Sequence, residues 1–226
     1  MRLMRRARTF RKMYKKIVLT LLSIALIGNV FAQKDPKARE ILDAMSAKYQ
    51  SIPSFQADLA YTMTNKVENI NESFNGKISV KGDMYRLAMQ EQEIYNDGET
   101  VWTFLPDIPE VTIDNNNPEA GDITPSSIFN IYKEGYKYVY LNSFTDGGKA
   151  YDVVDLVPND NDAQYFKVRI EIGANDKLLR KFILFDREGS EYAYVISNFK
   201  SDVNLADSHF KFDTSKLSED EIIDIR

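Results

Sequence analysis

The feature that most limits the folds open to this chain is a two-residue alternation of apolar and polar side chains that begins at Ser54. Every odd position from 55 to 63 is occupied by an apolar residue, namely Phe55, Ala57, Leu59, Tyr61 and Met63. The same period returns at 74–80 and at 85–89. Successive side chains of a strand point to opposite faces of its sheet, so the pattern predicts strands with one apolar face.

The connections between these segments are short and rich in turn-forming residues. Asn65 to Asn71 separate the first two segments, and Gly82-Asp83 separate the next two. The second half has the same organisation, with strands expected at 138–143, 151–157, 166–172, 178–185, 192–199 and 203–212. About eleven strands joined by short turns favour an α+β fold built on an incomplete, strongly curved antiparallel β-barrel.

Two segments have helical spacing, and we expect both helices to form a lid over the concave face of the sheet. The first begins at Asp35-Pro36 and ends before Pro53, with apolar positions at Ile41, Leu42, Met45 and Tyr49. The second begins at Thr124-Pro125 and ends at Gly135, with apolar positions at Ile128, Phe129, Ile131 and Tyr132. Each has a capping residue followed by proline at the first helical position.

The N-terminus is typical of a secretory signal peptide. The segment from Arg2 to Lys16 carries eight basic residues and no acidic one, and an apolar run of 15 residues follows, from Ile17 to Phe31. This run is short for a membrane span of about 20 residues. We expect residues 1–32 to be a signal peptide, with translation starting at Met1 or Met13, and residues 33–226 to be a single domain. The pair Arg5-Arg6 alone is weak support for a twin-arginine signal.

Charge and cysteine content narrow the functional classes. Without the eight basic residues of the leader, 21 basic residues face 34 acidic ones, a formal charge of −13. Such a surface repels nucleic acids and anionic lipid headgroups. The chain has no cysteine, so it has neither disulfides nor a cysteine for a lipid anchor. We expect a monomer that resides in the periplasm and binds no nucleic acid.

Catalytic patterns are missing from the sequence. His209 is the single histidine, no G-x-S-x-G motif occurs, and thiol chemistry needs a cysteine. Asn159 to Asp162 read as a polar turn, because the glycine and the later glutamate of a calcium loop are missing. We therefore expect no enzyme, no cofactor and no metal site. A hydrolase with two paired carboxylates remains an alternative, because sequence does not show how far apart acids lie in space.

Three stretches of the chain resemble the outer-membrane lipoprotein carrier (LolA) family. They are "SIPSFQADLAYTMTNKVENINESFNGKISVKGDMYRL", "IYNDGETVWTFLPDIPEVTI" and "DKLLRKFILFDREGSEYAYVISNFKSDVNLADSHFKF", and the resemblance covers most of residues 36–213. Its most specific part is the Asp97-Gly98 turn before Val101-Trp102. The resemblance implies a lipoprotein-carrier domain over 33–226 that shields acyl chains of lipoproteins and moves them from the inner to the outer membrane. The partners it implies are acylated lipoproteins, an inner-membrane ABC-type lipoprotein release complex, and an outer-membrane acceptor or the membrane itself.

A carrier of this kind needs a hydrophobic cavity, and the apolar strand residues are the candidates for its walls. We expect lipid binding by Phe55, Leu59, Tyr61, Ile78, Tyr85, Leu87, Met89, Trp102 and Phe104, with Ile128, Phe129 and Tyr132 on the lid. Ordinary core packing is the rival interpretation for each of them. The alternative function is a periplasmic lipid- or peptide-sensing interaction module on the same scaffold.

Overall fold

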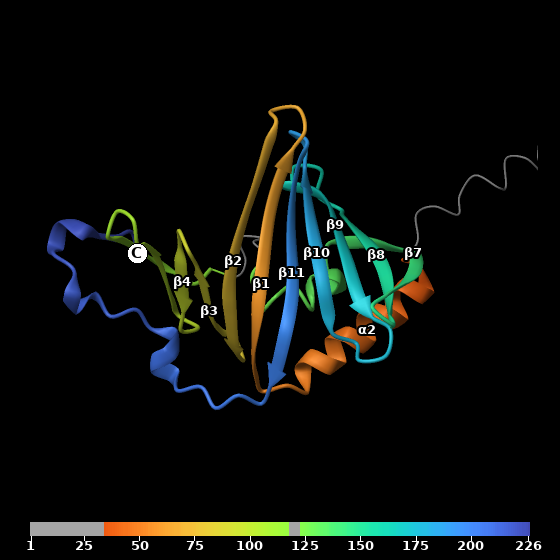
Figure 1. Cartoon of the computed structure of the whole chain (residues 1–226), viewed down its shortest axis with the longest axis horizontal. Helices are drawn as coiled ribbons and strands as arrows, with labels where there is room; N and C mark the ends of the chain where they lie inside the picture. The colour runs from red at the N-terminus through yellow and green to blue at the C-terminus, as the bar shows by residue number, and fades with distance from the viewer. Residues whose placement is uncertain (1–33, 118–122) are drawn as a thin grey trace, which may run out of the picture. The chain divides into compact units, whose positions relative to one another are not determined.

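The structure is a computed structural model that describes residues 34–117 and 123–226 (Figure 1). The predicted signal peptide lies outside the described residues. Asp35–Arg226 form one compact unit. Within the described ranges there is one α-helix, α2 (Pro36–Gln50). The strands are β1 (Ser54–Asn65), β2 (Ile70–Lys81), β3 (Met84–Met89), β4 (Glu93–Asn96), β5 (Thr100–Leu105), β6 (Glu110–Asn115), β7 (Tyr136–Asp146), β8 (Lys149–Pro158), β9 (Tyr165–Gly173), β10 (Leu179–Asp186), β11 (Ser190–Ser201) and β12 (Ile222–Asp224).

All twelve strands belong to one open sheet. Their order is β12-β6-β5-β4-β3-β2-β1-β11-β10-β9-β8-β7, so β12 and β7 are its two edges and the sheet does not close. Neighbouring strands run antiparallel, except that β12 pairs in parallel with β6. The predicted incomplete antiparallel barrel is confirmed as a mostly open antiparallel sheet.

Helix α2 forms where the sequence predicts it and packs on the sheet, running across the half that holds β7 to β10 (Figure 1). The Asp35 carboxylate caps its first turn by accepting the backbone N–H of Lys37 at 2.9 Å. Its buried face includes Ala38, Leu42 and Met45, none of which exposes any of its surface. These side chains share one core with apolar residues of β1, β2, β3, β8, β9 and β10.

The second predicted helix, over 124–135, is not formed, so the expected helical lid is not confirmed. Residues 125–130 form turns, and only Ile131–Lys133 make a short 3-10 helix, η2. The physical reason lies in the short polar side chains, which compete with helical hydrogen bonds. The Oγ atom of Ser127 accepts the N–H of Thr124 at 2.9 Å, and the N–H of Ser127 donates to Oγ1 of Thr124 at 3.1 Å.

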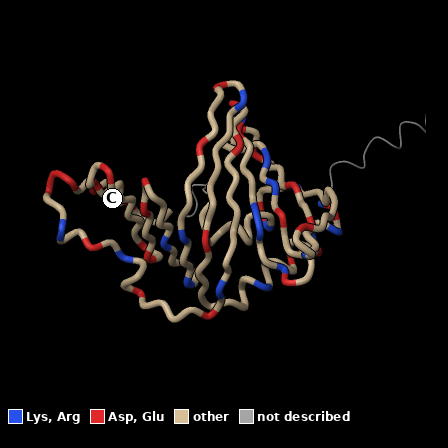
Figure 2. The backbone as a smooth tube through the Cα atoms, viewed as in Figure 1, with Lys and Arg blue, Asp and Glu red and all other residues tan. Residues whose placement is uncertain are grey.

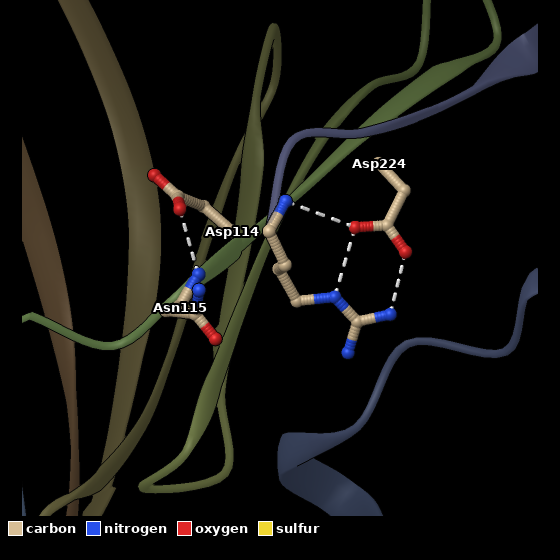
Figure 3. Close-up of polar contacts among 4 residues, drawn as sticks. Asp114, Asn115 and Asp224 are labelled. Atoms are coloured by element: carbon tan, nitrogen blue, oxygen red, sulfur yellow. Dashed lines mark hydrogen bonds and ion pairs between the residues drawn. The ribbon is translucent and has the colours of Figure 1, made fainter.

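The C-terminal region also differs from the prediction. The strand expected at 203–212 is wrong, since this segment is irregular and contains a 3-10 turn, η3 (Asp207–Phe210). The chain then continues to β12, a strand of three residues that the sequence pattern did not predict. Beyond β12 the Arg226 guanidinium donates two hydrogen bonds to the Asp224 carboxylate, as Figure 3 shows beside the local Asp114–Asn115 contact of β6.

Candidate functional site

A cavity of about 580 Å³ lies against one face of the sheet. We call this the inner face, and it carries Tyr85 and Leu87; the face that carries Arg86 is the outer face. Six interstrand spacings separate β4 from β9, about 29 Å in a flat sheet. Ile94 of β4 and Tyr165 of β9 nevertheless line the same cavity, which a curved sheet accounts for.

The wall formed by β1 to β4 is built by cross-strand pairs. Leu87 lies directly opposite Ile78 on one side and Ile94 on the other, so the three side chains share the inner face. Phe55 and Leu59 of β1 are about 95% buried, with 4% and 5% of their surfaces exposed. The apolar residues of the alternating pattern that begins at Ser54 therefore form part of this wall.

The opposite wall is aromatic and uncharged. The rings of Phe182 on β10 and Tyr194 on β11 stack with centroids 4.4 Å apart. Burial raises the pKa of the Tyr194 phenol and that of Tyr136, so both hydroxyls stay protonated at neutral pH. The wall thus offers ring faces and neutral hydroxyl groups to whatever occupies the cavity.

A segment that we call the roof, residues 123–133, closes the cavity from the side of α2. The ring of Phe129 stacks on Tyr49 of α2 with centroids 3.6 Å apart. The Ser46 hydroxyl donates to Oδ1 of Asn130 at 2.7 Å, which ties the roof to the same helix. Although it lacks an α-helix, this segment places Ile128 and Phe129 over the cavity.

The cavity opens to solvent beside the loop between β8 and β9. Three exposed polar residues of this loop line it: Asp160, Asp162 and Gln164. The two aspartates are the charged members of a lining that is otherwise mostly apolar. The geometry therefore combines an apolar interior with a polar mouth.

Seven of the twelve residues that the sequence suggests for lipid binding line this cavity. They are Phe55, Leu59, Ile78, Tyr85, Leu87, Ile128 and Phe129. The structure brings them together from β1, β2, β3 and the roof.

Three of the remaining five lie near the cavity without lining it. Tyr61 is on the inner face beyond Leu59, with its ring 5.0 Å from that of Tyr194. Met89 lies opposite Gly76 on the same face. Tyr132 is 2% exposed, and its hydroxyl donates to Oδ1 of Asp43 at 2.6 Å, so it anchors the roof to α2.

Trp102 and Phe104 lie on the outer face. They pair directly with Tyr95 and Glu93 of β4, whereas the cavity residue Ile94 pairs with Thr103. Residues on β5 alternate between faces, so the two aromatic side chains point away from the cavity. Phe104 instead packs against Phe212 of the C-terminal segment, with centroids 4.8 Å apart.

Sequence reasoning missed several cavity residues, half of them on β10 and β11. They are Ile94, Ile123, Tyr136, Tyr165, Phe182, Leu184, Tyr194 and Ile196. Phe182 and Leu184, and likewise Tyr194 and Ile196, are two residues apart, but Ile183 and Val195 lie between them, so apolar residues occupy consecutive positions and the two-residue period is obscured. The sequence also did not show that β11 pairs with β1 and that β10 follows β11 in the sheet.

Among the residues that the structure describes, no helix has the length and hydrophobicity to cross a membrane. No three of their acidic or histidine side chains come together in a group that could hold a metal ion.

An open antiparallel sheet curved around an apolar cavity with a polar mouth defines a class of β-sheet proteins built to enclose a hydrophobic group. Residues 50–213 match the family model described as outer membrane lipoprotein carrier protein LolA. The chain therefore belongs to the outer membrane lipoprotein carrier (LolA) family, as its sequence motifs suggested.

The relatives of the chain are distant but similar along most of its length. The outer-membrane lipoprotein carrier protein of Haemophilus ducreyi is 25% identical over 212 residues, covering 91% of this chain and 94% of the relative. That of Actinobacillus pleuropneumoniae is 23% identical over 215 residues, covering 92% and 94%. Among solved structures, an uncharacterized conserved protein from Thermus thermophilus is similar in fold, with a TM-score of 0.54, 13% identity, and 83% and 99% of the two chains covered.

Proposed function

We propose that this protein is a periplasmic carrier that shields the acyl chains of lipoproteins in its cavity and moves them from the inner to the outer membrane. The observation that carries the proposal is the unfilled volume of about 580 Å³ under the roof, walled by Leu87, Phe182 and other apolar side chains. Membership of the lipoprotein carrier family supports the nature of the cargo. The cargo would come from an ABC-type release complex and pass to an outer-membrane acceptor or to the membrane itself.

The size of the hydrophobic effect explains why such a carrier is needed. At roughly 0.8 kcal/mol per CH₂, immersing an acyl chain of about sixteen carbons in water costs on the order of 13 kcal/mol. The cargo therefore does not diffuse freely through an aqueous compartment. A cavity within the usual range of about 300–1,000 Å³ for small-ligand sites covers much of a chain, while its opening leaves a route back to a membrane.

The position of the mouth determines how the cargo would be oriented. The acyl chain occupies the interior, next to Phe55 and Tyr194, and the polypeptide of the lipoprotein remains outside, near Asp160 and Asp162. Because these carboxylates are exposed, they stay hydrated when the cavity is filled. The protein acts by binding and release, and none of these steps requires catalysis.

Native mass spectrometry of the protein purified from its own periplasm tests the proposal. We expect a fraction of the molecules to carry a lipoprotein, released as an intact acylated chain when the protein is unfolded. Stoichiometric capture of an unacylated regulatory protein, with an empty cavity in every preparation, would instead support the sensing function and contradict the carrier function.

A further inference from the structure

A second cavity, of about 340 Å³, lies on the outer face of the sheet, away from the lipid cavity. It forms where the C-terminal segment crosses β3, β4 and β5, and we call it the tail pocket. Arg86 of β3 lines it, whereas the neighbouring Tyr85 and Leu87 line the lipid cavity, so the two cavities are on opposite faces. A ligand in one cavity therefore does not touch a ligand in the other.

One wall of the tail pocket is aromatic. The ring of Phe212 makes an edge contact with Tyr95 at 5.4 Å and a tilted contact with Phe104 at 4.8 Å. Leu217 adds a half-buried aliphatic side chain. Such a surface suits a planar or hydrocarbon group of a ligand.

The other lining residues supply positive charge. Arg86 donates to Oε2 of Glu93 at 2.9 Å, and its guanidinium lies over the Tyr95 ring at 4.6 Å. Glu93 is its one hydrogen-bond partner among the described residues, so most of the five N–H groups of the guanidinium are unused. Lys211 forms an ion pair with Asp97 at 3.1 Å.

Lys216 is the cation of the tail pocket that takes part in none of the ion pairs found in the described ranges. It is exposed at the rim. Asp213 is the acidic residue among the lining, and its carboxylate accepts the N–H of Ser215 at 3.1 Å. Glu93 and Asp97 pair with Arg86 and Lys211, whereas Lys216 has no carboxylate of the described residues within ion-pair distance, so its ammonium group is open to an anionic ligand.

Three cations line the tail pocket although the chain as a whole is negatively charged. The chain carries a formal charge of −5, and Figure 2 shows both acidic and basic residues along the segment after β11, with an acidic stretch at 219–221. An anion is repelled by the chain as a whole, so a site for it depends on local contacts with Arg86 and Lys216. A forked guanidinium beside an ammonium group is suited to a carboxylate, which the guanidinium can bind through two parallel hydrogen bonds.

We propose that the tail pocket binds a small, singly charged organic acid. The carboxylate is held between Arg86 and Lys216, and the ring or hydrocarbon body lies against Phe104 and Phe212. The proposal is independent of lipoprotein transport, because none of these four residues lines the lipid cavity.

The chain contains its own reporters for this site. His209 is the single histidine and lines the tail pocket, with Nε2 3.0 Å from Oγ of Ser79. Trp102 is the single tryptophan and lies opposite Tyr95 on the same face. The NMR signals of one imidazole and the emission of one indole therefore report on the tail pocket without ambiguity of assignment.

Titration of the full chain with 2-naphthoate tests the proposal. We expect a saturable shift of the His209 imidazole signals together with a change in Trp102 emission. Lys216→Glu should weaken binding about tenfold, the loss of one charge-assisted hydrogen bond. Lys149→Glu is the matched control, because Lys149 is exposed at the start of β8, and it should leave binding unchanged.

Two outcomes would overturn the proposal. One is a shift that does not saturate or that is equally large in Lys216→Glu, provided that the free variant keeps the His209 spectrum of the parent. The other is a response of His209 to dioleoylphosphatidylglycerol vesicles but not to 2-naphthoate, which would make the ligand a membrane headgroup. A response to 2-naphthoate and none to the vesicles supports the free organic acid.

Discussion

The side chain of Asp35 joins the start of helix α2 to the edge of the sheet at Tyr140. Its Oδ2 atom accepts the backbone N–H of Tyr140 at 2.9 Å, while Oδ1 accepts the N–H of Lys37 at the same distance. The backbone N–H of Asp35 also donates to the carbonyl of Tyr138 at 3.1 Å. One residue therefore caps the helix and occupies hydrogen-bonding groups of edge strand β7 that would otherwise be available to another chain.

Asp35→Ala should lower the free energy of unfolding by about 1–2 kcal/mol, because it removes a helix cap and a second backbone contact. Urea denaturation followed by circular dichroism measures this. Asp35→Asn keeps an acceptor oxygen, so its free energy of unfolding should fall by less than that of Asp35→Ala. Equal loss in both variants would show that charge, and not capping geometry, is what stabilises this junction.

The contribution of Asp35 to the free energy of unfolding should depend on pH. The N–H of Tyr140 holds the pKa of its carboxyl below the ordinary value, even though desolvation acts in the other direction. A depressed folded-state pKa means that the stabilisation is complete above the unfolded-state value, near 4, and is lost as the pH falls through the lower, folded-state value. The stability difference between the parent and Asp35→Asn should therefore shrink on acidification from pH 5. A difference that grows over this range would contradict this role.

Substitutions at Tyr132 and Phe129 should distinguish the contribution of the roof to stability from its contribution to cargo binding. Tyr132→Phe removes a hydroxyl that donates to Asp43 and should cost about 1 kcal/mol of stability, with no change in acyl binding. Phe129→Ala removes both the stack on Tyr49 and part of the cavity lining, so it should lose about 3 kcal/mol and weaken binding. Denaturation and binding of a palmitoylated fluorescent peptide measure the two effects.

Trp102 should be insensitive to the occupant of the lipid cavity, because it lies on the outer face. Saturation with a palmitoylated peptide should leave its emission spectrum unchanged. Trp102→Phe should alter the affinity for that peptide by less than about twofold, since no contact with the ligand is lost. A large blue shift of the emission on peptide binding would mean that the indole faces the ligand.

Strands that bury only one of their two faces, such as β1, were predictable from the sequence. Residues 55–63 alternate because β1 buries one face only, and the strand forms over Ser54–Asn65. At β5 both faces are covered, so apolar residues occur at Val101 and Leu105 as well as at Trp102 and Phe104, and periodicity does not say which of them face the cavity. That ambiguity is why Trp102 and Phe104 were expected in the cavity.

The C-terminal segment was less predictable because tertiary contacts determine its path. Phe210 is fully buried and Phe212 half-buried against the outer face, a pattern that resembles a strand in sequence. Strand β12 has only three residues and depends on the free edge of β6, a partner that is distant in sequence. The roof does not form an α-helix because short polar side chains at 126, 127 and 130 compete for backbone hydrogen bonds.

The most direct test of the central claim is the affinity of Leu87→Glu for a palmitoylated peptide, compared with the parent and with Val139→Glu. Leu87 lies between Ile78 and Ile94 in the cavity wall, whereas Val139 is 45% exposed on β7. A carboxylate among hydrocarbon groups costs about 3 kcal/mol or more, so Leu87→Glu should lose at least about 100-fold in affinity while keeping a folded spectrum. Val139→Glu should bind like the parent. Undiminished binding by a folded Leu87→Glu variant would contradict the claim that this cavity holds the acyl chain.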